Sequence, residues 1–333
     1  MKINIADVKY KVVALLTDGS SLDLSNLITG FSWGKSKGEF ASKAEMEIAQ
    51  TKIPKGFIHE LLPLCTKLYI YADVGTGWDE TFRGSVWDWR YRSALQEQKT
   101  SLVVYDKSYY LTKSKDNSYY SAGQTTQAIV EDLCKRWGVA LEYGYDSITH
   151  EKVRYNSQAL ADQIENTIQE ANKKLGKNSV IYMKKDVLHI RKKGDNETIF
   201  CFTSKENAID TDMRMSMDTL VTKVVICGNS PDDGVAPTLK SKEGDTRYGV
   251  IQEIITKGTN TSLADAEKEA AELLRERGKP EQTIEVNLPD VPILCIGDKI
   301  KVSAGNLNTY FIVLGAMHYP DSKRMTVQLE YAR

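Results

Sequence analysis

The sequence is poor in the residues that build metal sites and disulfide frameworks. Its 333 residues include five cysteines and four histidines. The cysteines stand far apart, at positions 65, 134, 201, 227 and 295, without a Cys-x-x-Cys pair. Because structural zinc sites need closely spaced ligand pairs, we expect no metal, and nothing in the sequence implies a cofactor. An odd cysteine count without a secretory signal is typical of reduced, buried thiols in a protein made in the cytoplasm.

Long apolar runs and a strong net charge are also missing. No apolar run approaches the ~20 residues of a membrane-spanning helix, so we expect no membrane insertion. Asp7, Lys9 and Lys11 interrupt the apolar N-terminal stretch, which therefore reads as a strand and not as a signal peptide. The net charge of −1 gives no general argument for a nucleic-acid site. The hydrophobic content of 41% is that of a globular protein, and the length suits two or three domains.

The closing stretch of the chain alternates between apolar and polar residues. In its last run, Met325, Val327, Leu329 and Tyr331 fall on one face, which is the period of a half-buried strand. Pro, Gly and Asn residues separate the runs where strands turn. Short strands at this spacing predict a small antiparallel barrel or sandwich, with strands near 283–288, 299–303, 310–317 and 325–331.

The remaining sequence predicts an α+β fold that is mostly β. Residues 1–110 read as β hairpins, two of which turn at Asp18-Gly19 and at residues 75–77. A polar, tyrosine-rich linker is expected from about residue 109. Residues 111–205 then form an α+β middle domain, with one helix near 125–137 and a second that Ser157 caps and Gly176 ends. Residues 206–333 form a second β domain with a loop at 228–246 and one inserted helix, 263–277, capped by Ser262.

Several motifs of enzymes match only in part. Gly34 to Gly38 spell Gly-x-Ser-x-Gly, but neither a buried strand before it nor a helix after it is expected, so a polar hairpin turn is favoured. Residues 30–36 have three residues between the glycines where a P-loop needs four. His59-Glu60 begins a His-Glu-x-x-His pattern in which Pro63 occupies the second ligand position. The acidic groups at 210–218 and 232–233 lie in loop-like contexts. We therefore predict no catalytic residue.

The aromatic residues are the strongest candidates for a functional surface. Trp87, Trp89 and Tyr91 follow each other at i, i+2 and i+4, which predicts one face of one strand. Such a face fills a core, forms a subunit interface or stacks sugars, and the sequence leaves these alternatives open. The tyrosine pairs in the expected linker suit a contact surface. The candidate interface residues are Trp87, Trp89, Tyr91, Tyr109, Tyr110, Tyr119 and Tyr120.

Two segments carry a resemblance to a known family. One is the closing pattern that starts at Pro292-Ile-Leu-Cys-Ile-Gly-Asp, continues through Tyr310-Phe-Ile-Val-Leu to His318, and ends in Met325-Thr-Val-Gln-Leu-Glu. The other is Gln124-Thr-Thr-Gln-Ala-Ile-Val to Trp137-Gly-Val. Both resemble the baseplate hub proteins of contractile phage tails and of PBSX-type defective prophages, which are related to the late control D proteins. Ser32-Trp33-Gly34 is similar to a turn in the opening strands of that family.

The resemblance implies a virion structural protein and not an enzyme. It implies two tube-like β domains per subunit, which mimic a six-fold ring when three subunits assemble. The implied partners are two further copies, the tail tube or its initiator, the central spike, a LysM-type tail protein and the tape measure. The protein would be made in the bacterial cytoplasm and assembled into a phage or a bacteriocin-like contractile particle. The alternatives are a peptidoglycan hydrolase and a glycan-binding tail protein.

Overall fold

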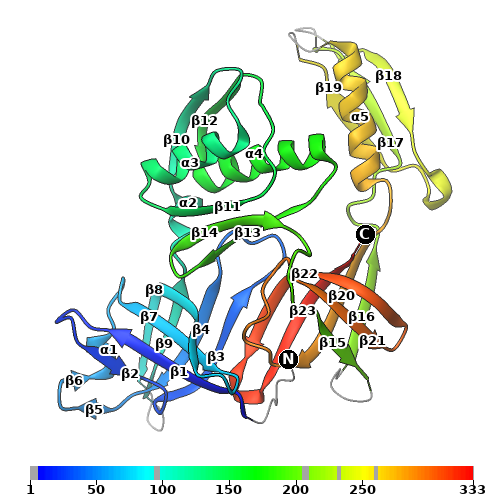
Figure 1. The fold of residues 1–333 in the computed structure, drawn as a ribbon. Helices are drawn as coiled ribbons and strands as arrows, with labels where there is room; N and C mark the ends of the chain where they lie inside the picture. Colours follow the sequence, from blue (N-terminus) through cyan, green and yellow to red (C-terminus); the bar gives the residue numbers. More distant parts are fainter. Residues whose placement is uncertain (1–6, 94–97, 205–209, 231–233, 259–261, 333) are drawn as a thin grey trace. The chain divides into compact units, whose positions relative to one another are not determined.

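The computed structural model describes residues 7–93, 98–204, 210–230, 234–258 and 262–332. These form two compact units, of which the first contains residues 1–211 and 285–333 and the second contains residues 212–284. The predicted α+β, mostly β fold is confirmed, because a 13-stranded sheet dominates the structure (Figure 1). The sequence-based domains, 1–110, 111–205 and 206–333, divide the chain differently. As independently folding segments they stay a prediction, and the boundary near 205 falls outside the described residues.

The first strands of the sheet surround one apolar core. Residues of alternating burial, such as Ala44, Met46 and Ile48, point inward, and a short helix, α1 (Ile58–Leu61), covers the cluster. The predicted hairpin at Asp18-Gly19 is confirmed, with Gly19 at a φ of +81° that a glycine adopts without strain. The strands are β1 (Lys9–Leu15), β2 (Ser21–Asp23), β3 (Ile28–Lys35), β4 (Lys43–Ala49), β7 (Lys67–Asp73), β8 (Trp78–Ser93) and β9 (Gln98–Tyr105), with the small hairpin of β5 (Lys52–Ile53) and β6 (Gly56–Phe57).

The middle of the chain is α+β, as predicted, but two local predictions are wrong. The expected tyrosine-rich linker forms α2 (Tyr109–Lys113) and β10 (Lys115–Tyr120). Ser157 does not cap a helix, because it lies inside β12 with a φ of +47°, and its N–H donates to Asn117. Helices α3 and α4 pack together over the sheet of β11, β14 and β13. The other elements are α3 (Thr126–Arg136), β11 (Ala140–Gly144), β12 (Val153–Ala159), α4 (Leu160–Leu175), β13 (Ser179–Lys184) and β14 (Val187–Lys192).

The closing strands complete the large sheet. Met325, Val327 and Leu329 are buried as the alternation predicts, while Tyr331 is exposed at the strand's end. Strand β22 lies between β23 and β3, so the two ends of the chain share one sheet (Figure 1). The strands are β15 (Phe200–Thr203), β16 (Asp210–Ser216), β20 (Glu281–Pro289), β21 (Lys299–Ala304), β22 (Leu307–Tyr319) and β23 (Arg324–Tyr331).

The second unit has its own small core. Val224 and Ile226 of the central strand pack against Ala266 and Ala270 of the helix. The predicted cap is confirmed, since the Ser262 hydroxyl accepts from the Asp265 N–H at 3.1 Å. The predicted loop at 228–246 is wrong in part, because it contains a strand, and Asp232 and Asp233 lie outside the described residues. The elements are β17 (Lys223–Cys227), β18 (Thr238–Glu243), β19 (Gln252–Thr256) and α5 (Leu263–Arg277).

None of the helices in the described ranges is long and apolar enough to cross a membrane.

Candidate functional site: the strand seam and the aromatic residues

A short antiparallel seam between β3 and β22 joins the first and the last strands of the chain. Gly34 lies opposite Met317, and its backbone has a φ of +148°. A Cβ atom at Gly34 would lie 2.0 Å from the carbonyl oxygen of Ala316. Only glycine therefore allows this approach of the two backbones. The Ser32-Trp33-Gly34 segment, predicted as a turn, is part of this strand.

Buried polar and aromatic groups hold the seam from one side. The Trp33 ring stacks on the ring of His318 with centroids 4.0 Å apart. The Nδ1 atom of His318 lies 2.6 Å from one oxygen of Asp290, and the Tyr10 hydroxyl donates to the other oxygen at 2.6 Å. Asp290 and His318 are almost fully buried. Burial, together with the Asp290 carboxylate, raises the pKa of Tyr10, so its hydroxyl stays a donor. The network ties β1, β3 and β22 to the loop after β20.

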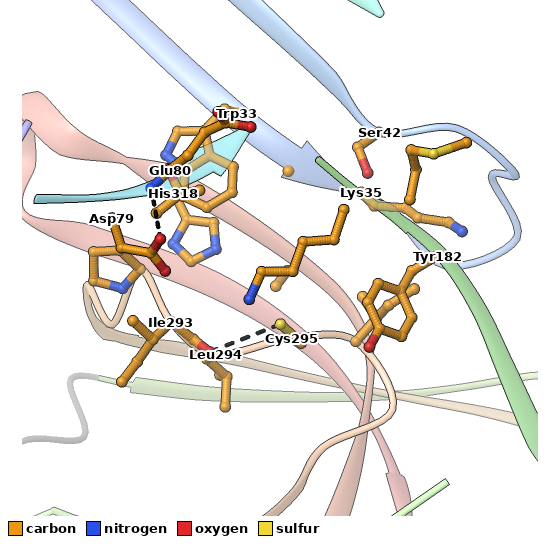
Figure 2. Close-up of a pocket in the computed structure, with 17 residues that line it drawn as sticks. Trp33, Lys35, Ser42, Asp79, Glu80, Tyr182, Ile293, Leu294, Cys295 and His318 are labelled. Carbon is orange, nitrogen blue, oxygen red and sulfur yellow. Dashed lines mark hydrogen bonds between the residues drawn. The ribbon is translucent and has the colours of Figure 1, made fainter. Parts of the chain in front are cut away.

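A small cavity of about 90 Å³ lies beside the seam. Figure 2 shows the Lys35 side chain reaching into it from β3, with Tyr182, Cys295 and Asp79 around it. The Lys35 amine donates to the carbonyl oxygen of Ile181 at 2.9 Å. Burial lowers the pKa of Lys35 to about 8, against the opposing attraction of nearby carboxylates. The amine thus ties β3 to the middle segment of the chain.

The predicted single face of Trp87, Trp89 and Tyr91 is wrong for Trp87. A β-bulge shifts the register between Val86 and Asp88, so Trp87 is the extra residue of the strand. Its ring meets Tyr109 and Tyr110 edge to face, with centroids 4.8 and 5.0 Å away. Trp89 and Tyr91 keep a common face. Trp89 packs on the core of the first strands, and Tyr91 stacks on His59 at 4.4 Å.

The tyrosine pairs lie in three different surroundings. Tyr109 stacks on Tyr105 at 3.7 Å, and 41% of Tyr110 is exposed. The Tyr120 hydroxyl donates to Asp132 at 2.7 Å, so this side chain ties β10 to α3. Tyr119 is 62% exposed. The structure thus brings together Trp87, Tyr109 and Tyr110, and separately Trp89 and Tyr91, and their role as an interface stays a prediction.

The partial enzyme motifs lie in ordinary structural positions. The Gly-x-Ser-x-Gly segment forms the end of β3 and the turn to β4, in agreement with the predicted hairpin turn. His59 lies in the one-turn helix α1, and Pro63 follows it. In the part of the chain that the structure describes, no group of three or more His, Cys, Asp or Glu side chains is arranged to hold a metal ion. The Tyr10–Asp290–His318 network has no signal in the sequence beyond a histidine near the end of an expected strand.

Comparisons with known proteins agree with this fold. The chain is similar to the protein YqbQ of Bacillus subtilis (strain 168), with 23% identity over 241 residues that cover 70% of this chain and 72% of YqbQ. Its structure is similar to the 43 kDa tail protein of prophage MuSo2 from Shewanella oneidensis, with a TM-score of 0.70, 13% identity, and coverage of 96% of this chain and 98% of that one. It is also similar to an E. coli type VI secretion component described as similar to T4 bacteriophage tail proteins gp27 and gp5. Here the TM-score is 0.54, with 11% identity, and 100% of this chain and 76% of that chain are covered.

The likeness to the two solved structures establishes the fold, which is that of a phage tail protein. The family follows from the sequence itself. The model of the YQBQ-like family matches residues 32–332, which includes β22, the part of β3 that pairs with it, and both segments that carry the hub resemblance. The chain belongs to the YQBQ-like family.

Proposed function

We propose that the protein is a structural subunit of the baseplate hub of a contractile phage tail or a bacteriocin-like tail particle. In this role three copies form a ring that joins the tail tube to the central spike. The tail tube or its initiator and the spike are the direct partners, and a LysM-type tail protein and the tape measure are further ones. The protein is made in the cytoplasm and then becomes part of the particle.

The observation that carries the proposal is the continuous sheet made by the β3–β22 seam. It runs from β16 at one end of the strand order to β2 at the other. An edge strand presents unpaired backbone groups, which pair readily with another strand. A closed ring of copies covers such edges, because each copy pairs one of its edges with the other edge of its neighbour. The tail-protein fold and the sequence resemblance support the same role.

A second support is the kind of polar group that the fold buries. Asp290, His318 and Tyr10 satisfy one another, and the Lys35 amine bonds a backbone carbonyl. These contacts hold strands together, whereas hydrolysis needs an acid, a base or a nucleophile that is free to act on a substrate. The cavity beside the seam, at about 90 Å³, is smaller than the ~300 Å³ or more of typical ligand pockets. Wider hollows of about 360 and 420 Å³ open beside Glu165 and beside Asp195.

The proposal is tested by locating the protein in purified tail particles. Particles are isolated from the producing strain, and an epitope tag on this protein is detected by immunogold electron microscopy. The expected result is labelling at the baseplate end of the tail only. Labelling along the whole tube, or protein that stays free in the lysate, would contradict the hub. Lysis of purified peptidoglycan by the isolated protein would favour the hydrolase instead.

A further inference from the structure

The two β parts of the chain share one strand order. The first part runs β3-β4-β9-β8-β7 across the sheet, and the closing part runs β16-β20-β23-β22-β21. Even the irregularities match, because β8 has its bulge between Val86 and Asp88, and β22 has one between Val313 and Gly315. In this repeat β8 corresponds to β22, and β3 corresponds to β16.

Because of this repeat, the pairing of β22 with β3 indicates how the corresponding strands, β8 and β16, can pair. In β22, residues Leu307–Ile312 pair with β21, and Ala316–His318 then pair with β3. In β8, residues Trp78–Ser85 pair with β7. Beyond the bulge, β8 pairs with β9 on one side, and among the described residues no strand pairs with its other side. Strand β16, the counterpart of β3, likewise ends the strand order. The chain itself therefore pairs β22 with β3. The two corresponding strands, β8 and β16, each keep an unpaired edge.

Building on the proposed ring, we infer that β16 of one copy pairs with the open edge of β8, residues 88–93, in the next copy. The pairing is antiparallel and follows the register of β3 on β22. The occupant of each edge is thus a second copy of this chain. Because the contact joins two different edges, it is head-to-tail, which is the kind of contact that a ring of identical copies requires. It also buries both edges that would otherwise invite uncontrolled strand pairing.

The register follows from side-chain contacts in the closing strands. Asn287 of β20 donates to Asp210 of β16 and accepts from Thr326 of β23. Counting from the two bulges, Thr326 of β23 takes the position of Ser101 of β9. Ser101 lies opposite Glu47 of β4, which in turn lies opposite Gly30 of β3. Asn287 therefore corresponds to Glu47, and Asp210 corresponds to Gly30. Counting along the two strands then places Met213 at the position of Trp33 and Met215 at the position of Lys35.

The apolar side chains of the two edges fit this register. Counting from the bulges, Tyr91 takes the position of His318 and Trp89 takes that of Ala316. Met213 of one copy then meets Tyr91 of the next, as Trp33 meets His318 within the chain. Met215 meets Trp89. The two methionines are 43% and 64% exposed, which is unusual for apolar residues on an edge strand. Sulfur–aromatic contacts of this kind are favourable.

The charged side chains of the two edges are complementary as well. Asp212 lies opposite Arg92 of the next copy and diagonal to Arg90, within reach of both guanidinium groups. Arg214 lies opposite Arg90, which is a like-charge pair, but it is diagonal to Asp88 of the next copy. The two carboxylates thus flank the two central arginines. Asp88, Arg90 and Arg92 are exposed, and within the described residues none of them has an ion-pair partner.

The first test needs no mutation. Free wild-type protein and purified tail particles are exposed to hydroxyl radicals, and oxidation is measured by mass spectrometry of peptides. We expect Met213 and Met215 to be oxidised at least five-fold more slowly in particles. Trp78, which is 51% exposed in the turn between β7 and β8, serves as a reference and should change less than two-fold. Equal oxidation of both methionines in the two samples overturns the inference and leaves the hub proposal standing. Absence of the protein from particles overturns both.

The second test fixes the register. Asp212→Cys and Arg92→Cys are combined in one chain in which the exposed Cys65 and Cys201 are both replaced by serine. Directly opposite Cβ atoms in a sheet lie within disulfide reach. Particles that contain this variant should give covalent dimers and trimers on a non-reducing gel. The matched control, Asp212→Cys with Lys115→Cys, places the second thiol on exposed β10 and should stay monomeric. Monomer alone from the first variant, or equal cross-linking in the control, overturns the register.

Discussion

Replacing Lys35 by methionine tests whether this lysine is buried at a cost to stability. The amine is almost fully enclosed, and its pKa falls from 10.5 to about 8 in the folded protein. Between these two values the unfolded chain binds more protons than the folded one, so the stability of the wild type rises with pH. Each unit of the shift corresponds to about 1.4 kcal/mol, so the charged amine costs roughly 3 kcal/mol at pH 7.

Methionine has a similar length and no charge, so Lys35→Met removes the cost together with the hydrogen bond to Ile181. The loss of that bond costs about 1 kcal/mol at every pH. We therefore expect the variant to be more stable than the wild type at pH 7 by about 2 kcal/mol. As the pH rises to 9.5, the unfolding free energy of the wild type should gain about 2 kcal/mol relative to the variant.

The assay is urea unfolding followed by tryptophan fluorescence at pH 7, 8, 9 and 9.5. Only the difference between the two proteins is interpreted, because other groups titrate in the same range. Lys67→Met, at an exposed position of β7, is the control and should show no comparable pH-dependent difference. If the difference between Lys35→Met and the wild type stays constant from pH 7 to 9.5, the reasoning about the buried amine is refuted.

Three further substitutions test the packing of the sheet. Leu329→Asp places an unpaired charge on the buried face of β23 and should lower the unfolding free energy by about 4 kcal/mol or more in urea. Gln328→Asp, on the other face, should lower it by less than half as much. Equal losses would show that the two faces of β23 are wrongly assigned. Gly34→Ala should open the seam because its Cβ meets the Ala316 carbonyl, and a melting temperature within 1 °C of the wild type would disprove the close approach. Tyr10→Phe leaves a buried carboxylate oxygen without its donor and should cost roughly 1–3 kcal/mol, so an unchanged unfolding free energy would count against the network.

Local patterns predicted much of the secondary structure. The alternation of Met325, Val327 and Leu329 identified the closing strand because one face is buried and the other is not. Helix α3 was predictable because Thr125 accepts from the Ala128 N–H and Gly138 supplies the left-handed residue after its end. In these cases the signal and the structure involve the same few neighbouring residues.

Other features depend on contacts that no local pattern records. The bulge at Trp87 adds one residue to the strand, but the aromatic residues still alternate in the sequence. The sequence alone therefore predicts a single aromatic face. Strand β18 is exposed along its length and forms by pairing with apolar β17, not through an apolar pattern of its own. The pairing of Trp33 with His318 joins the two ends of the chain. Its only signal was that both residues lie in segments that resemble the hub family.

The most direct test of the hub is the number of copies of this protein in each tail particle. Particles are purified, and this protein and the tube protein are quantified by mass spectrometry against isotope-labelled peptides. If the protein forms the hub, we expect three copies for each particle, independent of tail length. A copy number that rises with tail length, or a value near six or below one, would contradict a trimeric hub.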